Sequence, residues 1–510
     1  VVTPHNEAIR FEFERAFCRY MAREHGRDVD IDWRTPGGTS EIARYLKGEY
    51  TAAFRTLWTR SGASWNGEVE RAFMNRKLKR EDASETAWKA RQMFLDSDVG
   101  AGDADILFGG GWYDHNKFAR MGCTVPSGVQ TRHPEWFERE RPVLSPGMSG
   151  ETWYDRGDCY YGTCLTTFGI CYNVDRLAEL GYGTSASEPL PQRWEDLGDP
   201  RLYGCVGAAD PSKSGSITKC FEMLIQQRMA ESVAAATAQS GGTLDQEQLD
   251  KAVADGWNQA LLLVRKIGGN AQYFTFSASK VPLSVARGDV AVGMCIDFYG
   301  RTQAEWEESR LGRRTMRYVT PLAGSSVSAD PIAILRGAPH RELAEMFVDF
   351  SLSREGQQLW NYRPGTEGGP LKYALRRLPI RRDLYTKEDR EKMSDPDARP
   401  FAEAEAFTYH PEWTGRLFNL MRVLVRVMAI DCHEELRGAW SAILDAGGPD
   451  ATPDAMEAFS RLPVSYEESG DAARRIGSGE ERVVLMREWA HFFRASYAEA
   501  ETKARAVKGR

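Results

Sequence analysis

Four short segments of the sequence combine small residues with hydrogen-bond donors, and each follows a predicted strand. They are Pro4-His5-Asn6, Gly38-Thr39-Ser40, Gly109 to Trp112, and Ser212 to Ser216. In open α/β sheets, ligands bind beyond the carboxyl ends of the strands, where the first N–H groups of a helix lack partners. Such helix starts favour anions, and serine or threonine hydroxyls add direct hydrogen bonds. The chemistry that these segments predict is anion binding.

We expect the ligand-binding residues to come from these segments, and each has a plainer alternative. Ordinary N-capping accounts for any one of the helix starts, and the glycines also fit a tight turn. His5 fits a buried histidine at a strand end equally well, and Trp112 either lines the site or packs a loop. The coincidence of four segments at one end of a sheet favours binding. The candidates are His5, Asn6, Thr39, Ser40, Gly110, Gly111, Trp112, Ser214, Gly215 and Ser216.

Alternating strands and helices must position these residues. Apolar spacing predicts a strand at 1–3, a helix at 7–24, a strand at 29–33, a helix from residue 39, a helical insertion over 48–100 and a buried strand at 104–108. The pattern is typical of a parallel sheet with helices on its faces. The glycine run follows the last of these strands directly.

A second β-α series follows in the middle of the chain. Residues 162–172 and 205–209 are predicted strands, residues 216–228 a helix, and residues 290–296 another buried strand. The chain beyond about residue 380 is helical and charged, and the arginine-rich stretch 376–382 is interpreted as an exposed charged face. Two series of similar style indicate two similar lobes.

Composition limits the function classes. A length of 510 residues suggests two to four domains, and a net charge of −7 leaves no basic field for nucleic acid. No stretch of 18 uninterrupted apolar residues predicts a membrane span. The cysteines Cys171, Cys205, Cys220 and Cys295 fall in apolar patterns typical of buried free thiols, and the cluster Cys159, Cys164 and Cys171 lacks zinc-site spacing.

The usual catalytic signatures are missing from the sequence. It contains no P-loop lysine motif, no His-Glu-x-x-His and no Gly-x-Ser-x-Gly elbow. These absences weigh against a hydrolase, a kinase or a dehydrogenase without excluding any of them. The expectation that the protein is not an enzyme comes from the family resemblance described next.

Several ordered segments carry a resemblance to a known family. Cys171 to Gly181, Trp194 to Gly204, Ala209 to Ser216, Val290 to Tyr299 and Leu352 to Gln358 resemble the extracellular solute-binding proteins of ABC importers. The most similar branch contains ferric-ion-binding and hexose-phosphate-binding proteins. The resemblance covers roughly residues 1–47 and 102–385, and it is carried by the order of the motifs more than by any one of them.

The resemblance implies an α/β, two-lobed periplasmic-binding-protein-like (type II) fold with crossing hinge strands and an extra helical C-terminal segment. Lobe one is expected to hold residues 1–162 and 319–390, including the insertion at 48–100. Lobe two is expected to hold residues 163–318. Residues 391–510 are expected to form a helical C-terminal extension that packs on lobe one.

The resemblance also implies a function. The protein is expected to capture a small anionic solute, such as a phosphorylated sugar or a phosphonate, in an interlobe cleft and to deliver it to an ABC permease in the membrane. It is expected to be a monomer, to need no cofactor, and to work in the periplasm or outside the cell, with a lipid anchor on a missing N-terminal segment as one option. In ferric-binding relatives, the position of Ser214, Gly215 and Ser216 holds a synergistic anion.

The family position that carries two adjacent tyrosines in ferric-binding relatives is Phe298-Tyr299 here. Ferric ion prefers hard oxygen donors and tolerates an imidazole, so an alternative is ferric binding by His5, Asp297 and Tyr299 with a synergistic anion. With an organic anion, Asp297 accepts from solute hydroxyls or an amine and Tyr299 donates to the anion. The plainer alternative places Phe298 in the core and leaves Asp297 to cap the next helix.

Two rival functions stay open from the sequence. An enzyme on the same bilobal fold needs a titratable pair, for which His5 and Asp297 are the candidates. A sensory binding protein would dock on a receptor instead of a permease, and the residues do not separate it from a transporter.

Overall fold

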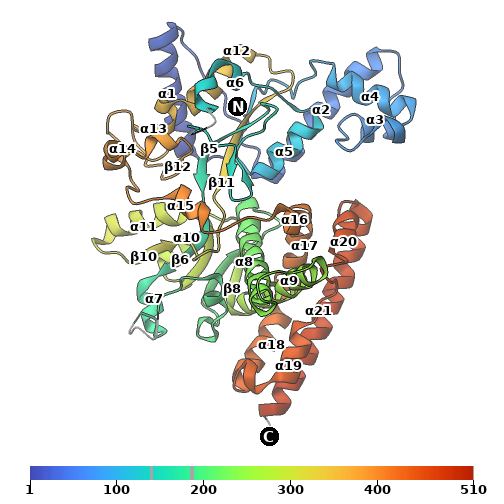
Figure 1. Ribbon diagram of the computed structural model, residues 1–510, viewed down its shortest axis with the longest axis vertical. Helices are drawn as coiled ribbons and strands as arrows, with labels where there is room; N and C mark the ends of the chain where they lie inside the picture. The colour runs from blue at the N-terminus through green and yellow to red at the C-terminus, as the bar shows by residue number, and fades with distance from the viewer. Residues whose placement is uncertain (138–139, 141, 184–188, 509–510) are drawn as a thin grey trace. The chain divides into compact units, whose positions relative to one another are not determined.

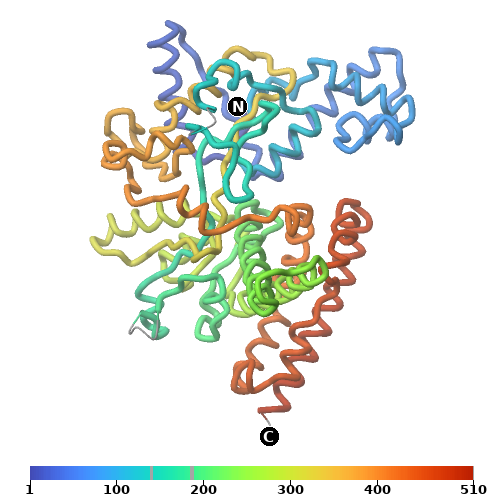
Figure 2. The backbone as a smooth tube through the Cα atoms, viewed as in Figure 1, coloured from blue at the N-terminus to red at the C-terminus, as the bar shows by residue number. Residues whose placement is uncertain are grey.

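The computed structural model describes residues 1–137, 140, 142–183 and 189–508. The chain forms two compact units (Figures 1 and 2). Unit 1 contains residues 1–166 and 327–402, and unit 2 contains residues 167–326 and 403–510. The chain therefore passes between units at 166/167, 326/327 and 402/403, the first two close to the lobe boundaries expected from the sequence.

The sheet of unit 1 is built around the long strand β11 (Ser328–Leu335). The strand order is β1 (Ile106–Phe108), β11, β5 (Tyr161–Thr166) and β12 (Leu378–Pro379), with β2 (Thr124–Val125) also on β11. All of these pairings are antiparallel. The strand predicted at 29–33 is absent as a regular strand, and Val2 makes single-residue parallel bridges to Arg34 and to Leu107. The parallel sheet expected here is therefore limited to these bridges, because β11 pairs with its neighbours in the antiparallel sense.

The remaining elements of unit 1 are mostly helices. The helices α1 (Glu7–His25) and α2 (Thr39–Arg60) open the chain, and α1 ends at Gly26, whose φ of 61° is the left-handed conformation that glycine favours. The others are α5 (Trp112–Met121), α6 (Val129–Arg132), η2 (Pro134–Phe137), β3 (Gly147–Met148), β4 (Glu151–Thr152), α12 (Arg341–Leu352), α13 (Arg354–Gln358), η5 (Arg382–Leu384), α14 (Lys387–Lys392) and α15 (Pro400–Glu405).

The insertion at residues 48–100 is helical, and its buried side chains share one core cluster with Ile42, Leu107 and Phe118 of unit 1. After α2 it contains α3 (Gly67–Ala72), η1 (Arg80–Asp82) and α4 (Glu85–Leu95). Its centre is aromatic: Phe54 and Phe73 stack with their ring centroids 4.7 Å apart, and Phe94 packs edge-on against both. Burial of these rings explains why a segment rich in charge stays folded.

Unit 2 is built on a mixed sheet. Its strand order is β10 (Met316–Val319), β6 (Phe168–Asn173), β9 (Val292–Ile296), β7 (Val206–Ala209) and β8 (Ala271–Thr275). Strand β7 runs parallel to both of its neighbours, whereas β6 is antiparallel to β9 and β10. The other elements of residues 167–326 are α7 (Val174–Glu179), η3 (Trp194–Gly198), η4 (Pro200–Leu202), α8 (Gly215–Gln239), α9 (Gln246–Asn270), α10 (Lys280–Arg287) and α11 (Asp297–Leu311).

The predicted strand at 162–172 is two strands that belong to different sheets. Strand β5 ends at Thr166 in unit 1, and β6 begins at Phe168 in unit 2. Every residue of both strands is buried, so no alternation of polar and apolar residues marks the change. This break is the first passage of the chain between the units.

The C-terminal helices pack on unit 2, so the expectation that residues 391–510 pack on lobe one was wrong for residues 403–510, whereas residues 391–402 cluster with unit 1. From residue 403 the chain clusters with unit 2. Helix α17 (Phe418–Ala429) packs against α8 and α9, and α18 (His433–Asp445) packs against α9 (Figure 1). Nine residues of α17 are buried, which explains the placement: its wide apolar surface needs the large faces of α8 and α9.

The other elements of this segment complete a helical layer. They are α16 (Pro411–Thr414), η6 (Gly415–Leu417), η7 (Pro449–Ala451), α19 (Pro453–Ser460), α20 (Ser469–Ile476) and α21 (Gly479–Lys508). None of the helices in the described part of the chain combines the length and the apolar character that a bilayer crossing requires.

Candidate functional site

The structure brings His5, Thr39 and the glycine run together in unit 1. Gly109 has a φ of +87°, and a Cβ on it would lie 2.4 Å from Nε2 of His5. Gly110 has a φ of +94°, and a Cβ there would lie 3.0 Å from Cγ2 of Thr39. The glycines therefore allow two predicted site residues to approach the backbone that follows β1.

The other predicted residues of unit 1 lie at the starts of helices. Asn6 caps α1, because its Oδ1 accepts a hydrogen bond from the N–H of Ile9 at 3.1 Å. Ser40 lies in the first turn of α2, whose N-cap is Gly38. Gly111 is the N-cap of α5, and Trp112 is its first residue. Asn6 therefore has the plainer role of an N-cap.

A buried ion pair that the sequence did not predict lies beside His5. The guanidinium of Arg377 is 2.6 Å from Oδ2 of Asp330, and the same oxygen is 3.9 Å from Nε2 of His5. The Arg377 side chain is 1% exposed and that of Asp330 is 16% exposed. Burial opposes ionisation of Asp330, but Arg377 overcomes it and lowers the pKa of this carboxyl.

The imidazole of His5 is buried without a close partner. Its side chain is 4% exposed, and within the described residues neither ring nitrogen has a hydrogen bond. Burial lowers the pKa of His5, so the ring is neutral near pH 7. A neutral imidazole offers one donor and one acceptor, and a buried pair of unused polar atoms points to a ligand or a water as the missing partner.

His115 contacts the backbone turn at Gly109. With its proton on Nε2, it donates to the carbonyl oxygen of Gly109 at 3.0 Å. Its side chain is fully buried, and this burial lowers the pKa of His115 to about 4. A neutral His115 therefore holds the backbone turn against which His5 packs.

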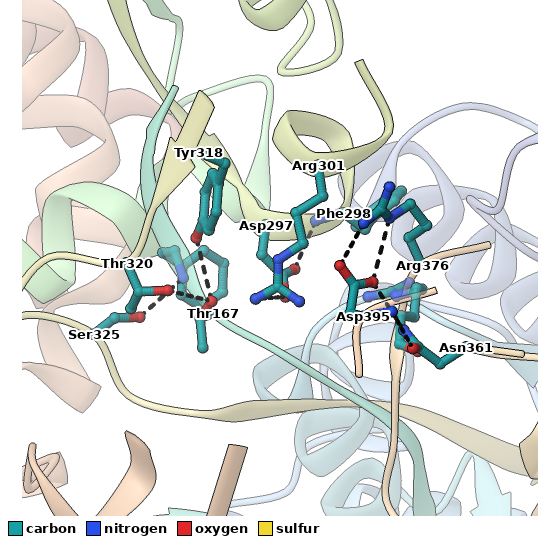
Figure 3. Close-up of polar contacts among 12 residues, drawn as sticks. Thr167, Asp297, Phe298, Arg301, Tyr318, Thr320, Ser325, Asn361, Arg376 and Asp395 are labelled. Atoms are coloured by element: carbon teal, nitrogen blue, oxygen red, sulfur yellow. Dashed lines mark hydrogen bonds and ion pairs between the residues drawn. The ribbon is translucent and has the colours of Figure 1, made fainter. Parts of the chain in front are cut away.

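The arginine-rich stretch 376–382 is not an exposed face, so that interpretation was wrong. Arg377 and Arg381 are buried, and Arg376 forms an ion pair with Asp395 at 2.6 Å (Figure 3). Asn361 joins the two, since its Nδ2 donates to Asp395 and to the carbonyl oxygen of Arg377, both at 3.1 Å. A sequence signal for this burial exists, because the apolar residues Leu375 and Leu378, both buried, lie on either side of Arg376 and Arg377.

In unit 2, the predicted residues Ser214, Gly215 and Ser216 form the start of α8. Ser214 is the N-cap, and its Oγ accepts a hydrogen bond from the N–H of Ile217 at 3.3 Å. The hydroxyls of Ser214 and Ser216 are 3.1 Å apart. The N–H groups of Gly215 and Ser216 precede the first residue that can bond within the helix, so an external acceptor suits them. N-capping and anion binding are compatible at this position.

Asp297 and Tyr299 lie at the start of α11. Asp297 is fully buried; its Oδ1 accepts from the N–H of Phe298 at 2.8 Å, and its Oδ2 is 3.6 Å from Arg301 (Figure 3). Tyr299 is half-buried, with its ring centroid 4.1 Å from that of Phe298. Phe298 is buried, as the plainer alternative expects, whereas Asp297 is the first residue of α11 and does not cap it, because the N-cap is Ile296.

A hydroxyl cluster lies near this helix in unit 2. Thr167 Oγ1 is 3.2 Å from the hydroxyl of Tyr318 and 3.1 Å from Oγ1 of Thr320 (Figure 3). Arg301 lies over the Tyr318 ring, 5.6 Å from its centroid. These groups satisfy one another, so they form a structural network next to Asp297.

The cysteines predicted to be buried free thiols lie in or next to strands of unit 2 and in α8. Cys171, Cys220 and Cys295 are buried and Cys205 is half-buried, and the described residues contain no disulfide bond. Within the described residues, no three His, Cys, Asp or Glu side chains are grouped as a metal site.

A comparison with protein families found a similarity in the central segment. Residues 137–366 match the model of the bacterial extracellular solute-binding proteins. This part of the chain is therefore similar to that family. The match spans the first two passages between the units and the start of α8.

A curated protein of Haemophilus influenzae, described only as uncharacterized, is 27% identical to this chain over 258 residues. The alignment covers 50% of this chain and 60% of that protein, so the chain spans about three fifths of its relative's length.

Solved structures of periplasmic binding proteins are similar at low sequence identity. AfuA of Actinobacillus pleuropneumoniae, with fructose 6-phosphate bound, is 18% identical with a TM-score of 0.41, covering 70% of this chain and 79% of AfuA. Iron-bound HitA of Pseudomonas aeruginosa is 16% identical with a TM-score of 0.44, covering 81% of this chain and 92% of HitA.

Proposed function

We propose that the protein is the solute-binding component of an ABC importer and that it captures a small anionic solute. The family match supports solute binding, and the start of α8 carries the preference for an anion. Ser214, Gly215 and Ser216 there combine two neighbouring hydroxyls with two N–H groups that the helix itself does not use. The helix is 25 residues long, so its dipole adds positive potential at this end.

The energy available at such a site matches a transport affinity. Hydrogen bonds to charged groups contribute about 1.5–3 kcal/mol each, and a micromolar dissociation constant corresponds to about −8.2 kcal/mol. One of the two hydroxyls donates to the other, so three donors remain, one hydroxyl and two backbone N–H groups, and their sum reaches that range without a metal. A phosphate or phosphonate group presents enough oxygens to use all of them.

In unit 1, His5, Thr39 and the turn at Gly110 and Gly111 form a second set of polar groups. The ring nitrogens of His5, which have no hydrogen bond, suit a hydroxyl group of the solute or a bound water. A phosphorylated sugar or a hydroxylated phosphonate carries such groups beside its anion. The interlobe cleft expected from the sequence stays a prediction.

The alternative of ferric binding by His5, Asp297 and Tyr299 has less support. Both carboxylate oxygens of Asp297 face donors of their own helix, the N–H of Phe298 and the guanidinium of Arg301. A carboxylate engaged in this way is a poor ligand for a hard cation. An organic anion is therefore the better proposal. Delivery to a membrane permease, a monomeric state and a location in the periplasm or outside the cell follow from the family and belong to the same proposal.

The proposal is tested by a thermal-shift panel of inorganic phosphate, hexose phosphates, phosphonates, ferric salts and polyamines. A ligand that binds only the folded protein, at 100 times its dissociation constant, adds about 2.7 kcal/mol to stability. We expect a phosphate-containing solute to raise the melting temperature. Ser214→Asp keeps a good N-cap and adds a negative charge, so it should abolish the response.

Ser353→Asp is the matched control, because Ser353 caps α13 in unit 1 in the same way. It should leave the response intact. An anion response that survives Ser214→Asp would show that α8 does not hold the anion. A turnover screen on phosphate esters, with measurable product, would favour the enzyme alternative instead.

A further inference from the structure

The loop at residues 210–214, which joins β7 to α8, is bound by the C-terminal helices. Nε of Arg422 donates to the carbonyl oxygen of Pro211 at 3.0 Å, and Nη1 of Arg426 donates to Oγ of Ser212 at 3.3 Å. The hydroxyl of Thr218, on α8, donates to the same Pro211 carbonyl at 2.8 Å. Two consecutive loop residues are thus held by arginines of one helix, α17.

The segment before α17 is fastened to α8 through a buried carboxylate. Glu222 on α8 accepts hydrogen bonds from the hydroxyls of Tyr409 at 2.9 Å and Thr414 at 2.7 Å. Nζ of Lys219 lies 3.0 Å from its second oxygen. The Glu222 side chain is 1% exposed, so removing these partners would leave a buried charge unpaired.

Gln226, one turn further along α8, makes a second fastening. Its Nε2 donates to the carbonyl oxygen of His410 at 2.7 Å and to the hydroxyl of Thr414 at 2.8 Å, and its Oε1 accepts from the N–H of His410 at 3.0 Å. Because every polar atom of this buried amide is used, only one placement of residues 409–414 satisfies it. Helix α17 therefore starts from a defined position on α8.

The direction of these bonds matters for the proposed anion site. The arginines of α17 donate to oxygen atoms of the loop, so the loop's acceptors turn toward α17. The N–H groups of Gly215 and Ser216 lie at the helix start, and the guanidinium of Arg422 stands beside the loop that precedes them. The guanidinium of Arg426 also contacts the loop, but it is paired with Asp431, whose Oδ1 lies 3.3 Å from its Nε. The N–H groups and the charge of Arg422 favour an anion at this position.

We propose that Arg422 and Arg426 are positioning residues, through which the C-terminal extension (residues 403–510) holds the loop 210–214 in the geometry that presents the start of α8. The inference deepens the proposed function, and its effect on affinity rests on that function. The hold on the loop itself is a property of the solute-free protein and can be measured separately.

The first experiment is hydrogen exchange of the solute-free, full-length chain carrying Arg422→Lys. Lysine keeps the charge but does not reproduce the guanidinium hydrogen bonds. The hydrogen-bonded amides of Ser212, Lys213, Ile217 and Thr218 should exchange at least tenfold faster, while those in the middle of α8 should not change. Arg494→Lys is the matched control, because Arg494 is an arginine of the same extension that bonds Glu435 and the carbonyl oxygen of Asp431. Unchanged exchange of those four amides in Arg422→Lys would overturn the proposal.

The second experiment measures inorganic phosphate binding by calorimetry in the same proteins. Arg422→Lys should weaken binding about tenfold, and Arg494→Lys should not. In Arg422→Ala, added guanidinium ion should restore affinity, a rescue that loss of stability alone would not give. If Arg422→Ala does not fold, Tyr409→Phe, which removes one bond to Glu222, should weaken binding in the same direction.

The two measurements separate the failures. If the unmodified protein binds no phosphate, the proposed anion site is wrong, and the exchange data alone decide whether the arginines hold the loop. If exchange accelerates in Arg422→Lys while phosphate affinity stays unchanged, the loop does not control binding and the positioning role is overturned.

Discussion

At the scale of single residues, unit 1 contains a buried ion pair between Arg377 and Asp330. Arg377 is buried and pairs with Asp330 at 2.6 Å, and its guanidinium lies 5.8 Å from the ring centroid of Trp360. Taking a charge out of water is costly unless its partner stays in place. The pair therefore matters most for what happens when one member is lost.

Arg377→Met should destabilise the protein by about 3–5 kcal/mol, because it leaves the Asp330 carboxylate without its cation. The double variant Arg377→Met with Asp330→Asn should recover a large part of that loss. Urea unfolding of both single variants and the double variant measures the coupling. A cost below about 1 kcal/mol for Arg377→Met would contradict the ion pair.

His115 predicts a pH dependence of stability. Burial lowers its pKa in the folded state to about 4, against about 6.5 when unfolded, so below pH 6.5 the unfolded chain binds more protons. Stability from this group is complete above pH 6.5 and falls as the pH drops toward 4, on the order of 3 kcal/mol in all.

His115→Gln keeps a side-chain amide that can donate to Gly109 but does not titrate. The unfolding free energy of this variant should fall less than that of the unmodified protein between pH 6.5 and 4. Denaturant titrations at several pH values measure the difference, and parallel curves would show that His115 is accessible or already charged.

At the scale of elements, sequence patterns predicted the helices well where one face is apolar. The helix at 7–24 is present with small changes at its ends, and the strand and helix start around Ser214 are present, because caps mark them locally. The helix predicted at 216–228 continues to Gln239, so its end was predicted eleven residues too early. The break between β5 and β6 and the burial of Arg377 were not predictable from local patterns. Both depend on contacts with β11 and β12, strands more than 150 residues away from β5.

The candidate site was predicted unevenly for the same reason. Thr39, the glycine run and Ser214 to Ser216 lie at helix starts, which short motifs mark. Asp330 was missed because it lies in a strand of otherwise apolar and small residues. At this aspartate the register with β5 shifts, and such irregularities redirect a side chain without leaving a sequence motif.

The aromatic core of the insertion gives a prediction at this scale. Phe54→Ala should cost about 3–5 kcal/mol, because Phe54 is fully buried and stacked on Phe73. Phe276→Ala is the control, since Phe276 is 78% exposed, and it should change stability little. Chemical unfolding of both variants tests the difference, and equal effects would mean that the insertion does not fold as a core.

At the scale of the whole molecule, both units are discontinuous in sequence, and unit 2 is completed by residues from the C-terminal quarter of the chain. Helices α17 and α18 cover apolar faces of α8 and α9 that would otherwise meet water. Unit 2 is therefore expected to need residues 403–510 in order to fold.

A chain that ends at residue 402 should aggregate or lose cooperative unfolding, because the faces of α8 and α9 that α17 covers become exposed. Size-exclusion chromatography and thermal unfolding by circular dichroism measure the effect. A monomeric truncated chain with an unchanged melting temperature would show that the C-terminal helices are dispensable for unit 2.

The contact between α17 and the loop after β7 limits how this chain can be re-engineered. Grafting residues 403–510 onto a shorter relative would bring two guanidinium groups that require oxygen atoms at the places of Pro211 and Ser212. A chimera that exchanges only the loop or only the helix would lose the hydrogen bonds between the arginines and the loop. The loop at residues 210–214 and helix α17 must therefore be transferred together.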